Sequence, residues 1–205
     1  MKTILHLCAD IGSDSYPYQI DPSYEVIKIG KDIGVENYHP DRPIHGIIAN
    51  PVCTEFSTLR RHPALRASRP EDGMALVKEC QRVIEEANPT WWVIENPATG
   101  SLRTFLGPPV ATYHPWMYGS PWTKATALWG KFNMPRRLFQ DWESVPKLPL
   151  YTRPGRGKPN FAFLHKSAID LIPEFAAFKD FIKYDSDFRS LCSQGFATEF
   201  KKYNP

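Results

Sequence analysis

Paired cysteines, long apolar runs and an excess of charge are what this 205-residue chain lacks. Its four cysteines lie far apart and form no CxxC pair, which argues against a zinc knuckle and against a disulfide framework. No apolar run is long enough to span a membrane, and the apolar stretch near Met1 is too short for a signal peptide. We therefore expect a soluble, cytoplasmic protein with no metal site and no membrane partner.

The net charge and the absence of repeats exclude few further classes of protein. The net charge of +3 allows a nucleic-acid partner without implying one, so only local clusters of basic residues can argue for it. Internal repeats and low-complexity segments are absent. Apolar residues make up 42% of the chain and charged residues 23%, as in ordinary globular proteins. The length fits one domain over residues 1–205, and the twenty prolines indicate many shaped loops.

A cysteine follows one of the buried strands that the sequence predicts. The apolar residues 47–49 predict a short strand, and Asn50-Pro51 ends it because proline has no N–H for a strand ladder. Cys53 comes directly afterwards, at the strand's carboxyl end, where open α/β sheets bind ligands. Cys53 is therefore a candidate nucleophile. The alternative is a buried structural thiol, which is common for free cysteine.

A carboxylate closes another predicted strand in the same manner. Residues 91–94 are apolar, and Glu95-Asn96-Pro97 follows them. A carboxyl group at the end of such a strand loses part of its hydration, which raises its pKa and lets it donate a proton near neutral pH. We favour this catalytic interpretation of Glu95 over a helix-capping or salt-bridged glutamate.

The amino-terminal segment has the order of elements found in nucleotide-binding folds. Residues 4–8 predict a first strand that runs into a turn containing Asp10 and Gly12. Residues 24–29 predict a second strand, and Asp32 lies just after it, where such folds often hold a ribose. A plain surface turn is the alternative for Gly12.

Basic residues gather in two places. Arg60 and Arg61 belong to a basic stretch after Cys53, which would suit phosphate contacts or form a solvated loop. Residues 131–166 form a loop-rich insert in which Arg153 and Arg156 lie among aromatic residues, a pattern compatible with a nucleic-acid surface.

Helices are expected in three places. Residues 70–87 predict an amphipathic helix with Cys80 on its core face and a capping box that begins at Ser68. Residues 169–182 contain Pro173 and predict at best a broken helix. Residues 193–200 predict a terminal helix.

Together these motifs resemble those of DNA cytosine-5 methyltransferases, and more closely the short methylase-like proteins often found in phage genomes. The nucleophile motif is matched by residues 50–57 and the glutamate motif by residues 92–97; the two are specific as a pair. Supporting similarity lies at residues 6–15, where the family has its first cofactor-binding motif, and at residues 118–129 and 189–197.

The resemblance implies a three-layer α/β sandwich of the Rossmann-like methyltransferase fold with a mainly parallel sheet. It implies that Cys53 attacks carbon 6 of cytosine while Glu95 protonates ring nitrogen 3, so that carbon 5 accepts a methyl group. A base within a duplex cannot reach such residues without flipping. The implied cofactor is S-adenosylmethionine; the residues implied for it are Asp10, Gly12, Asp32, Asn50 and Pro51.

Departures from the family pattern leave alternatives open. Asp10 stands where the first glycine of the cofactor motif is expected, Val52 replaces a proline, and Lys124 is the nearest basic residue to a missing arginine pair. One alternative is a pyrimidine-modifying enzyme with a different donor or with a free nucleotide as its substrate. Another is a non-catalytic protein that binds nucleic acid or blunts a host defence. Amino-group methylation is disfavoured, because Cys53 stands where that chemistry needs an aromatic ring.

Overall fold

The computed structural model describes residues 1–9, 11–56 and 69–205. In this part of the chain six strands form one sheet in the order β2-β1-β3-β4-β6-β5. Strands β1 to β4 run parallel, while β6 is antiparallel to both of its neighbours. The strands are β1 (Lys2–Leu7), β2 (Tyr24–Ile29), β3 (Gly46–Ala49), β4 (Trp91–Pro97), β5 (Ala111–Tyr113) and β6 (Thr126–Lys131).

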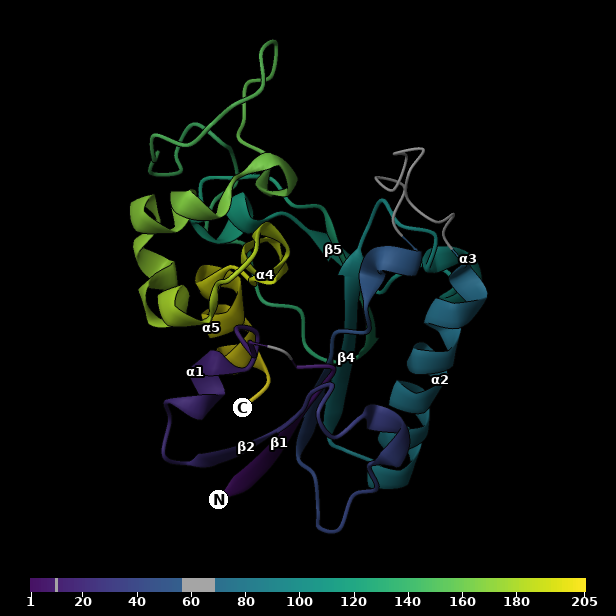
Figure 1. Cartoon of the computed structure of the whole chain (residues 1–205). Helices are drawn as coiled ribbons and strands as arrows, with labels where there is room; N and C mark the ends of the chain where they lie inside the picture. Colours follow the sequence, from purple (N-terminus) through teal and green to yellow (C-terminus); the bar gives the residue numbers. More distant parts are fainter. Residues whose placement is uncertain (10, 57–68) are drawn as a thin grey trace.

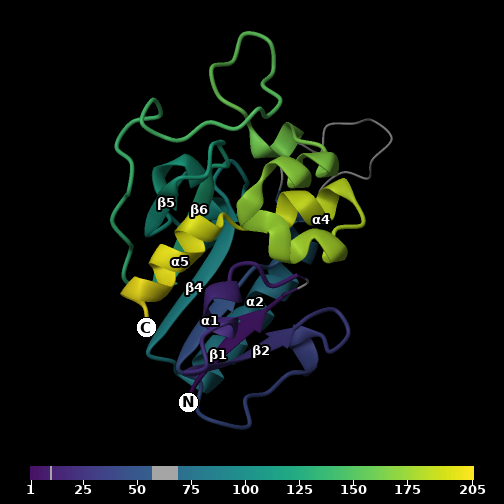
Figure 2. The same ribbon diagram turned by 90° about the vertical axis from the view of Figure 1, so that its left-hand side faces the viewer.

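Helices cover both faces of the sheet (Figures 1 and 2). The α-helices are α1 (Tyr16–Gln19), α2 (Pro70–Ala87), α3 (Arg103–Leu106), α4 (Asp185–Ser190) and α5 (Gln194–Tyr203). Short 3-10 helices connect them: η1 (Val35–Asn37), η2 (Cys53–Glu55), η3 (Pro115–Tyr118), η4 (Phe161–Phe163), η5 (Lys166–Leu171) and η6 (Pro173–Phe181).

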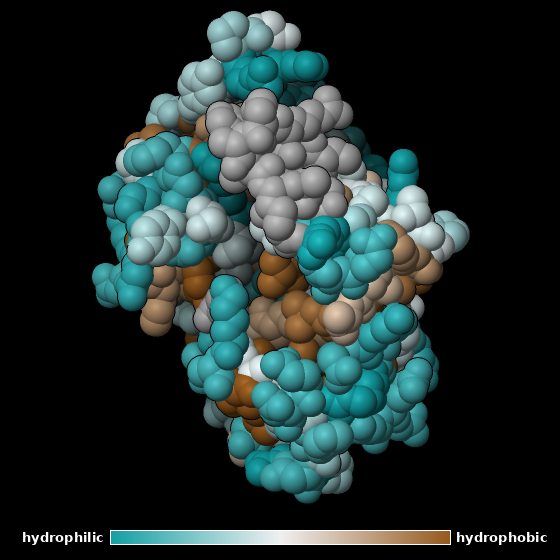
Figure 3. Space-filling view, turned by 45° about the vertical axis from the view of Figure 1, so that its right-hand side comes forward, coloured by the Kyte–Doolittle hydropathy of each residue, from teal (hydrophilic) through white to brown (hydrophobic). Residues whose placement is uncertain are grey.

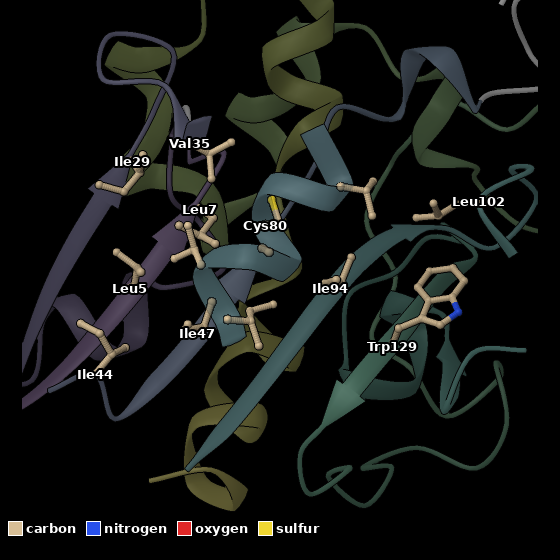
Figure 4. Close-up of a cluster of buried hydrophobic side chains, with 14 of the residues drawn as sticks. Leu5, Leu7, Ile29, Val35, Ile44, Ile47, Cys80, Ile94, Leu102 and Trp129 are labelled. Atoms are coloured by element: carbon tan, nitrogen blue, oxygen red, sulfur yellow. The ribbon is translucent and has the colours of Figure 1, made fainter. Parts of the chain in front are cut away.

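One face of the sheet packs on α2. Alternate strand residues point to this side, among them Leu5, Ile47 and Ile94, and they meet the apolar stripe of α2 that includes Cys80 (Figure 4). Cys80 is fully buried there, as the helical periodicity predicts. Seen from this side of the molecule, apolar residues also reach the surface between hydrophilic ones (Figure 3).

The opposite face packs on α1 and α5. Ile48, Val93 and Leu128 point to this side, and Phe196 and Phe200 of α5 cover them. The sheet is buried on both faces at β3 and β4, which explains why these strands read as continuous apolar runs. The chain therefore has the Rossmann-like, three-layer α/β fold with a mainly parallel sheet that the sequence predicts.

A third apolar cluster lies beside the sheet, under η4, η5, η6 and α4. Trp122, Phe161 and Phe175 form its centre, with Trp122 and Phe161 stacked at 5.2 Å between ring centroids. Residues 132–160, all of them described, form no helix or strand. The last part of this stretch projects at the end of the molecule where the parallel strands finish (Figures 1 and 2).

The predicted helices are partly revised. The terminal helix is present as α5, and residues 169–182 form 3-10 helices interrupted at Ile172, because proline follows it. Ser68, where the predicted capping box begins, lies outside the described residues; the structure has Arg69 at the N-cap position of α2, and the Arg69 backbone N–H donates to the Glu55 carboxylate at 2.7 Å. Among the described residues, no helix is long and apolar enough to cross a membrane.

Candidate functional site

The strand register brings three polar side chains together at the carboxyl ends of β1, β3 and β4. Ala49 pairs with Ile94, so Asn50 and Glu95 come next to each other, one residue further along. His6 pairs with Ile48 on the other side of β3. Because side chains alternate along strands, His6, Asn50 and Glu95 all point to the face covered by α5. The sequence predicted Asn50 and Glu95 at this edge, but it did not single out His6.

Hydrogen bonds join these three residues into a chain. His6 Nε2 donates to Asn50 Oδ1 at 2.6 Å, and Asn50 Nδ2 donates to Glu95 Oε2 at 3.0 Å. The other ring nitrogen of His6 lies 2.8 Å from Ser15 Oγ. The Asn50 amide is thus oriented from both sides, and it fixes the position of the Glu95 carboxyl group.

The electrostatic surroundings of Glu95 favour its protonated form. Burial is the main cause that raises the pKa of this carboxyl group, and the neighbouring Asp14 carboxylate raises it further. The Lys124 ammonium and the Asn50 hydrogen bond act in the opposite direction but do not cancel the effect. Glu95 can therefore hold a proton at a pH where an exposed glutamate would have lost it.

Cys53 is the first residue of η2, on the loop that follows β3. The Asn96 amide holds this loop to β4 by donating to the Pro51 carbonyl oxygen at 2.9 Å. The Asn-Pro pairs that end β3 and β4 are thus tied to each other. Burial raises the pKa of the Cys53 thiol, and the nearby Glu95 carboxylate raises it further, whereas Lys124 lowers it.

Lys124 supplies the positive charge of this group. Its Nζ donates to the Leu191 carbonyl oxygen at 3.1 Å and lies 5.6 Å from the centroid of the Phe161 ring. From there the ammonium acts on both Glu95 and Cys53. The cysteine, the glutamate and the lysine therefore share one electrostatic environment, although they are far apart in sequence.

A small cavity of about 20 Å³ lies under Glu95, between the sheet and α5. Its walls are mostly apolar, with Asp14, Glu95 and Cys192 as the residues that carry a titratable group. Burial is the main cause that raises the pKa of the Cys192 thiol far above its usual range. This thiol is therefore a poor nucleophile, and Cys53 is the better candidate.

Two of the residues expected to hold S-adenosylmethionine, Gly12 and Asp32, follow β1 and β2. Gly12 has a φ of +80°, a backbone conformation that favours glycine, and a Cβ atom built there would lie 2.5 Å from Cε of Lys28. Burial lowers the pKa of Lys28, whose Nζ donates to the Ile11 carbonyl oxygen at 3.3 Å. Asp32 is exposed just beyond β2.

Lys28 and Asp32 would suit a cofactor that has a carboxylate and a ribose. The Asp32 carboxylate can accept from ribose hydroxyls, and the Lys28 ammonium can pair with a carboxylate. Asn50 is engaged by His6 and Glu95, and the Pro51 carbonyl accepts from Asn96, so the polar groups of these two residues have partners within the protein. Lys28 was missed from sequence because it lies within a strand and not in a loop.

The remaining predicted residues lie elsewhere. Asp10, Arg60 and Arg61 fall outside the described residues. Arg153 and Arg156 are exposed on the projecting loop. In the parts of the chain that the structure describes, no group of three or more His, Cys, Asp or Glu residues could hold a metal ion.

Comparison with solved structures shows a weak structural likeness. No family model and no curated protein matches the chain. A crystal structure from E. coli, described as a "putative DNA modification methyltransferase encoded within prophage", is 15% identical, with a TM-score of 0.45. The match covers 72% of this chain and 51% of that one. The chain thus spans about half the length of that protein, and a likeness at this level does not by itself assign an activity.

Proposed function

We propose that this protein is a DNA cytosine-5 methyltransferase-like enzyme. The observation that carries the proposal is the grouping of Cys53, Glu95 and Lys124. Glu95 and Lys124 both shift the pKa of the Cys53 thiol, and Lys124 also shifts the pKa of the Glu95 carboxyl group. A thiol nucleophile beside a carboxyl group with a raised pKa is the pair that pyrimidine activation requires.

The chemistry begins at the thiol. The Cys53 thiol loses its proton to solvent, and the resulting thiolate forms a bond to carbon 6 of cytosine while the Glu95 carboxyl group gives its proton to ring nitrogen 3. The electron pair of the ring's 5,6 double bond then makes carbon 5 nucleophilic. After carbon 5 gains a methyl group, its own proton passes to solvent water and the electron pair of that C–H bond re-forms the 5,6 double bond. The sulfur leaves carbon 6 as a thiolate, and nitrogen 3 returns its proton to Glu95.

The local charges suit these steps. The Cys53 thiolate is hindered by an ionised Glu95 and helped by Lys124. A protonated Glu95 removes the repulsion, so the thiolate and the carboxylic acid are compatible with each other while two anions are not. We assign Asn50 to orient Glu95, and His6 to orient Asn50, because their hydrogen bonds form one chain.

S-adenosylmethionine would supply the methyl group as an electrophile when bound. In this proposal Gly12 provides the turn, Asp32 meets the ribose, and Lys28 meets the carboxylate of the methionine moiety. Asp10 stays a prediction from the sequence. A different donor remains the second candidate, because Lys28 would equally pair with another anionic group.

Mass analysis of the nucleosides tests the proposal. Wild-type protein incubated with cytosine-containing DNA and S-adenosylmethionine is expected to produce 5-methylcytosine. Cys53→Ser and Glu95→Gln are each expected to lower the rate by a factor of about 10² or more. Glu143→Gln is the control, because this exposed carboxylate lies outside the pair. Methylation by Cys53→Ser at the wild-type rate would overturn the assignment, and a modified base of another mass would identify a different donor.

A further inference from the structure

A hollow of about 510 Å³ opens beside the projecting loop, separate from the cavity under Glu95. We call it the basic hollow. The lining residues used below are Thr123, Tyr151, Arg153, Arg156, Lys158 and Phe163. The surrounding stretch, residues 144–169, contains no Asp or Glu and has five Lys or Arg residues.

A tight turn holds two of the cations close together. Pro154 and Gly155 occupy its middle, Gly155 has a φ of +74°, and the Arg156 N–H donates to the Arg153 carbonyl oxygen at 3.0 Å. These are features of a type II turn, in which the first and last Cα atoms are less than about 7 Å apart. No carboxylate among the described residues lies within ion-pair distance of Arg153 or Arg156. Two neighbouring like charges without an internal counter-ion suit an external polyanion.

Aromatic rings stand beside these cations. The Arg153 guanidinium lies 4.5 Å from the centroid of the Phe163 ring, and Phe163 is 39% exposed. Tyr151 is 59% exposed at the same hollow. Exposed rings can stack on unpaired bases. Bases inside a duplex are stacked on one another, so their faces are not accessible to these rings. Cations that track phosphates together with rings that stack on bases are typical of single-strand binding sites.

The basic hollow is attached to the segment that carries Lys124. The N–H and the hydroxyl of Thr123 both donate to the Pro159 carbonyl oxygen, at 2.9 and 3.1 Å, and the Phe161 N–H donates to the Thr123 carbonyl oxygen at 2.9 Å. Thr123 therefore lines the hollow, while the next residue acts on Glu95 and Cys53. A strand held in the hollow would contact the residue that directly precedes Lys124.

We propose that the basic hollow binds a single-stranded DNA segment that adjoins the target base. Arg153, Arg156 and Lys158 contact phosphates, and Tyr151 and Phe163 stack on unpaired bases. The choice of DNA rests on the proposed function; the preference for a single strand rests on the hollow itself.

Fluorescence anisotropy tests this proposal without a methyl donor. The probe is a labelled single-stranded oligodeoxynucleotide of about 12 nucleotides. The same sequence as a duplex and as single-stranded RNA provides two comparison arms. Arg153→Gln/Arg156→Gln is expected to weaken binding at least tenfold, and to reduce the slope of log affinity against log salt by about 1.4. Tyr151→Ala is expected to weaken binding without changing that slope. Lys78→Gln/Lys183→Gln removes two exposed charges elsewhere and should bind as wild type.

The outcomes separate this inference from the proposed function. The binding assay contains no methyl donor, so a protein that binds the oligonucleotide but does not methylate DNA would leave this inference standing. Unchanged binding by the double arginine variant would overturn the inference even if methylation is found. Equal or tighter binding of the duplex, or of the RNA strand, would likewise overturn it.

Discussion

At the scale of single residues, the site depends on a glutamate whose surroundings oppose its charge. Burial and the Asp14 carboxylate raise the pKa of Glu95, and Lys124 and Asn50 offset this only in part. The folded protein therefore binds the Glu95 proton more tightly than the unfolded chain does. Stability from this group is present at low pH and falls as the pH rises above 4.5, the ordinary pKa of glutamate, through the raised value.

Replacement of Glu95 by glutamine should remove the free-energy cost of burying an ionised carboxylate at this position. The amide has nearly the same shape, its oxygen can still accept from Asn50, and it has no charge to desolvate. We expect the free energy of unfolding of Glu95→Gln to be about 1 kcal/mol larger than that of the wild type at pH 8. The advantage should vanish at pH 4, where the wild-type carboxyl group is protonated. Urea titrations at the two pH values measure this, and a variant less stable than wild type at pH 8 would contradict it.

At the scale of elements, the close packing of α5 against η3 limits which residue can occupy position 195. Gly195 is in the first turn of α5, and a Cβ atom at this position would lie 2.0 Å from the Tyr118 carbonyl oxygen. Helix propensity alone favours alanine over glycine by about 1 kcal/mol. The close approach to backbone decides otherwise, because a carbonyl oxygen cannot move away as the end of a flexible side chain can.

We therefore expect Gly195→Ala to destabilise the protein by roughly 2–4 kcal/mol, the range of strong steric conflicts in a packed core. Gly157→Ala is the matched control, since no atom lies within 4 Å of a Cβ built there. This control should change stability by less than about 0.5 kcal/mol. Thermal unfolding of both variants measures the difference. Equal stability of the two would show that α5 can shift away from η3.

At the scale of the whole molecule, helices cover both faces of the sheet. A ligand can therefore reach the sheet mainly at the edge where the parallel strands end. At the edge where the parallel strands begin, Lys2 Nζ and His45 Nε2 both form hydrogen bonds with the backbone oxygen of Pro205. Residues Lys2 and Pro205 are therefore held together at that edge. Residues from β1, β3, β4 and the segment before β6 meet at the opposite edge. A ligand bound there contacts several elements at once and should stabilise the entire fold.

S-adenosylmethionine at about 100 times its dissociation constant should add about 2.7 kcal/mol to the free energy of unfolding. For a chain of this size, that corresponds to a rise of about 5–10 °C in Tm. Asp32→Ala should reduce the rise, and Asp180→Ala, which removes an exposed carboxylate far along the chain, should not. Scanning calorimetry measures all three proteins. An unchanged Tm at millimolar ligand would contradict the proposed donor.

The sequence by itself determined the strands β1 to β4, the α2 core stripe and the polar residues at two strand ends. Apolar periodicity and the Asn-Pro stops act locally, so they can be read without coordinates. Only the tertiary structure decided that Lys124 acts on Glu95, that His6 holds Asn50, and that Lys28 covers Gly12. These contacts join strands and loops that are distant in the chain. They depend on register and on which face each side chain points to, which local pattern does not contain.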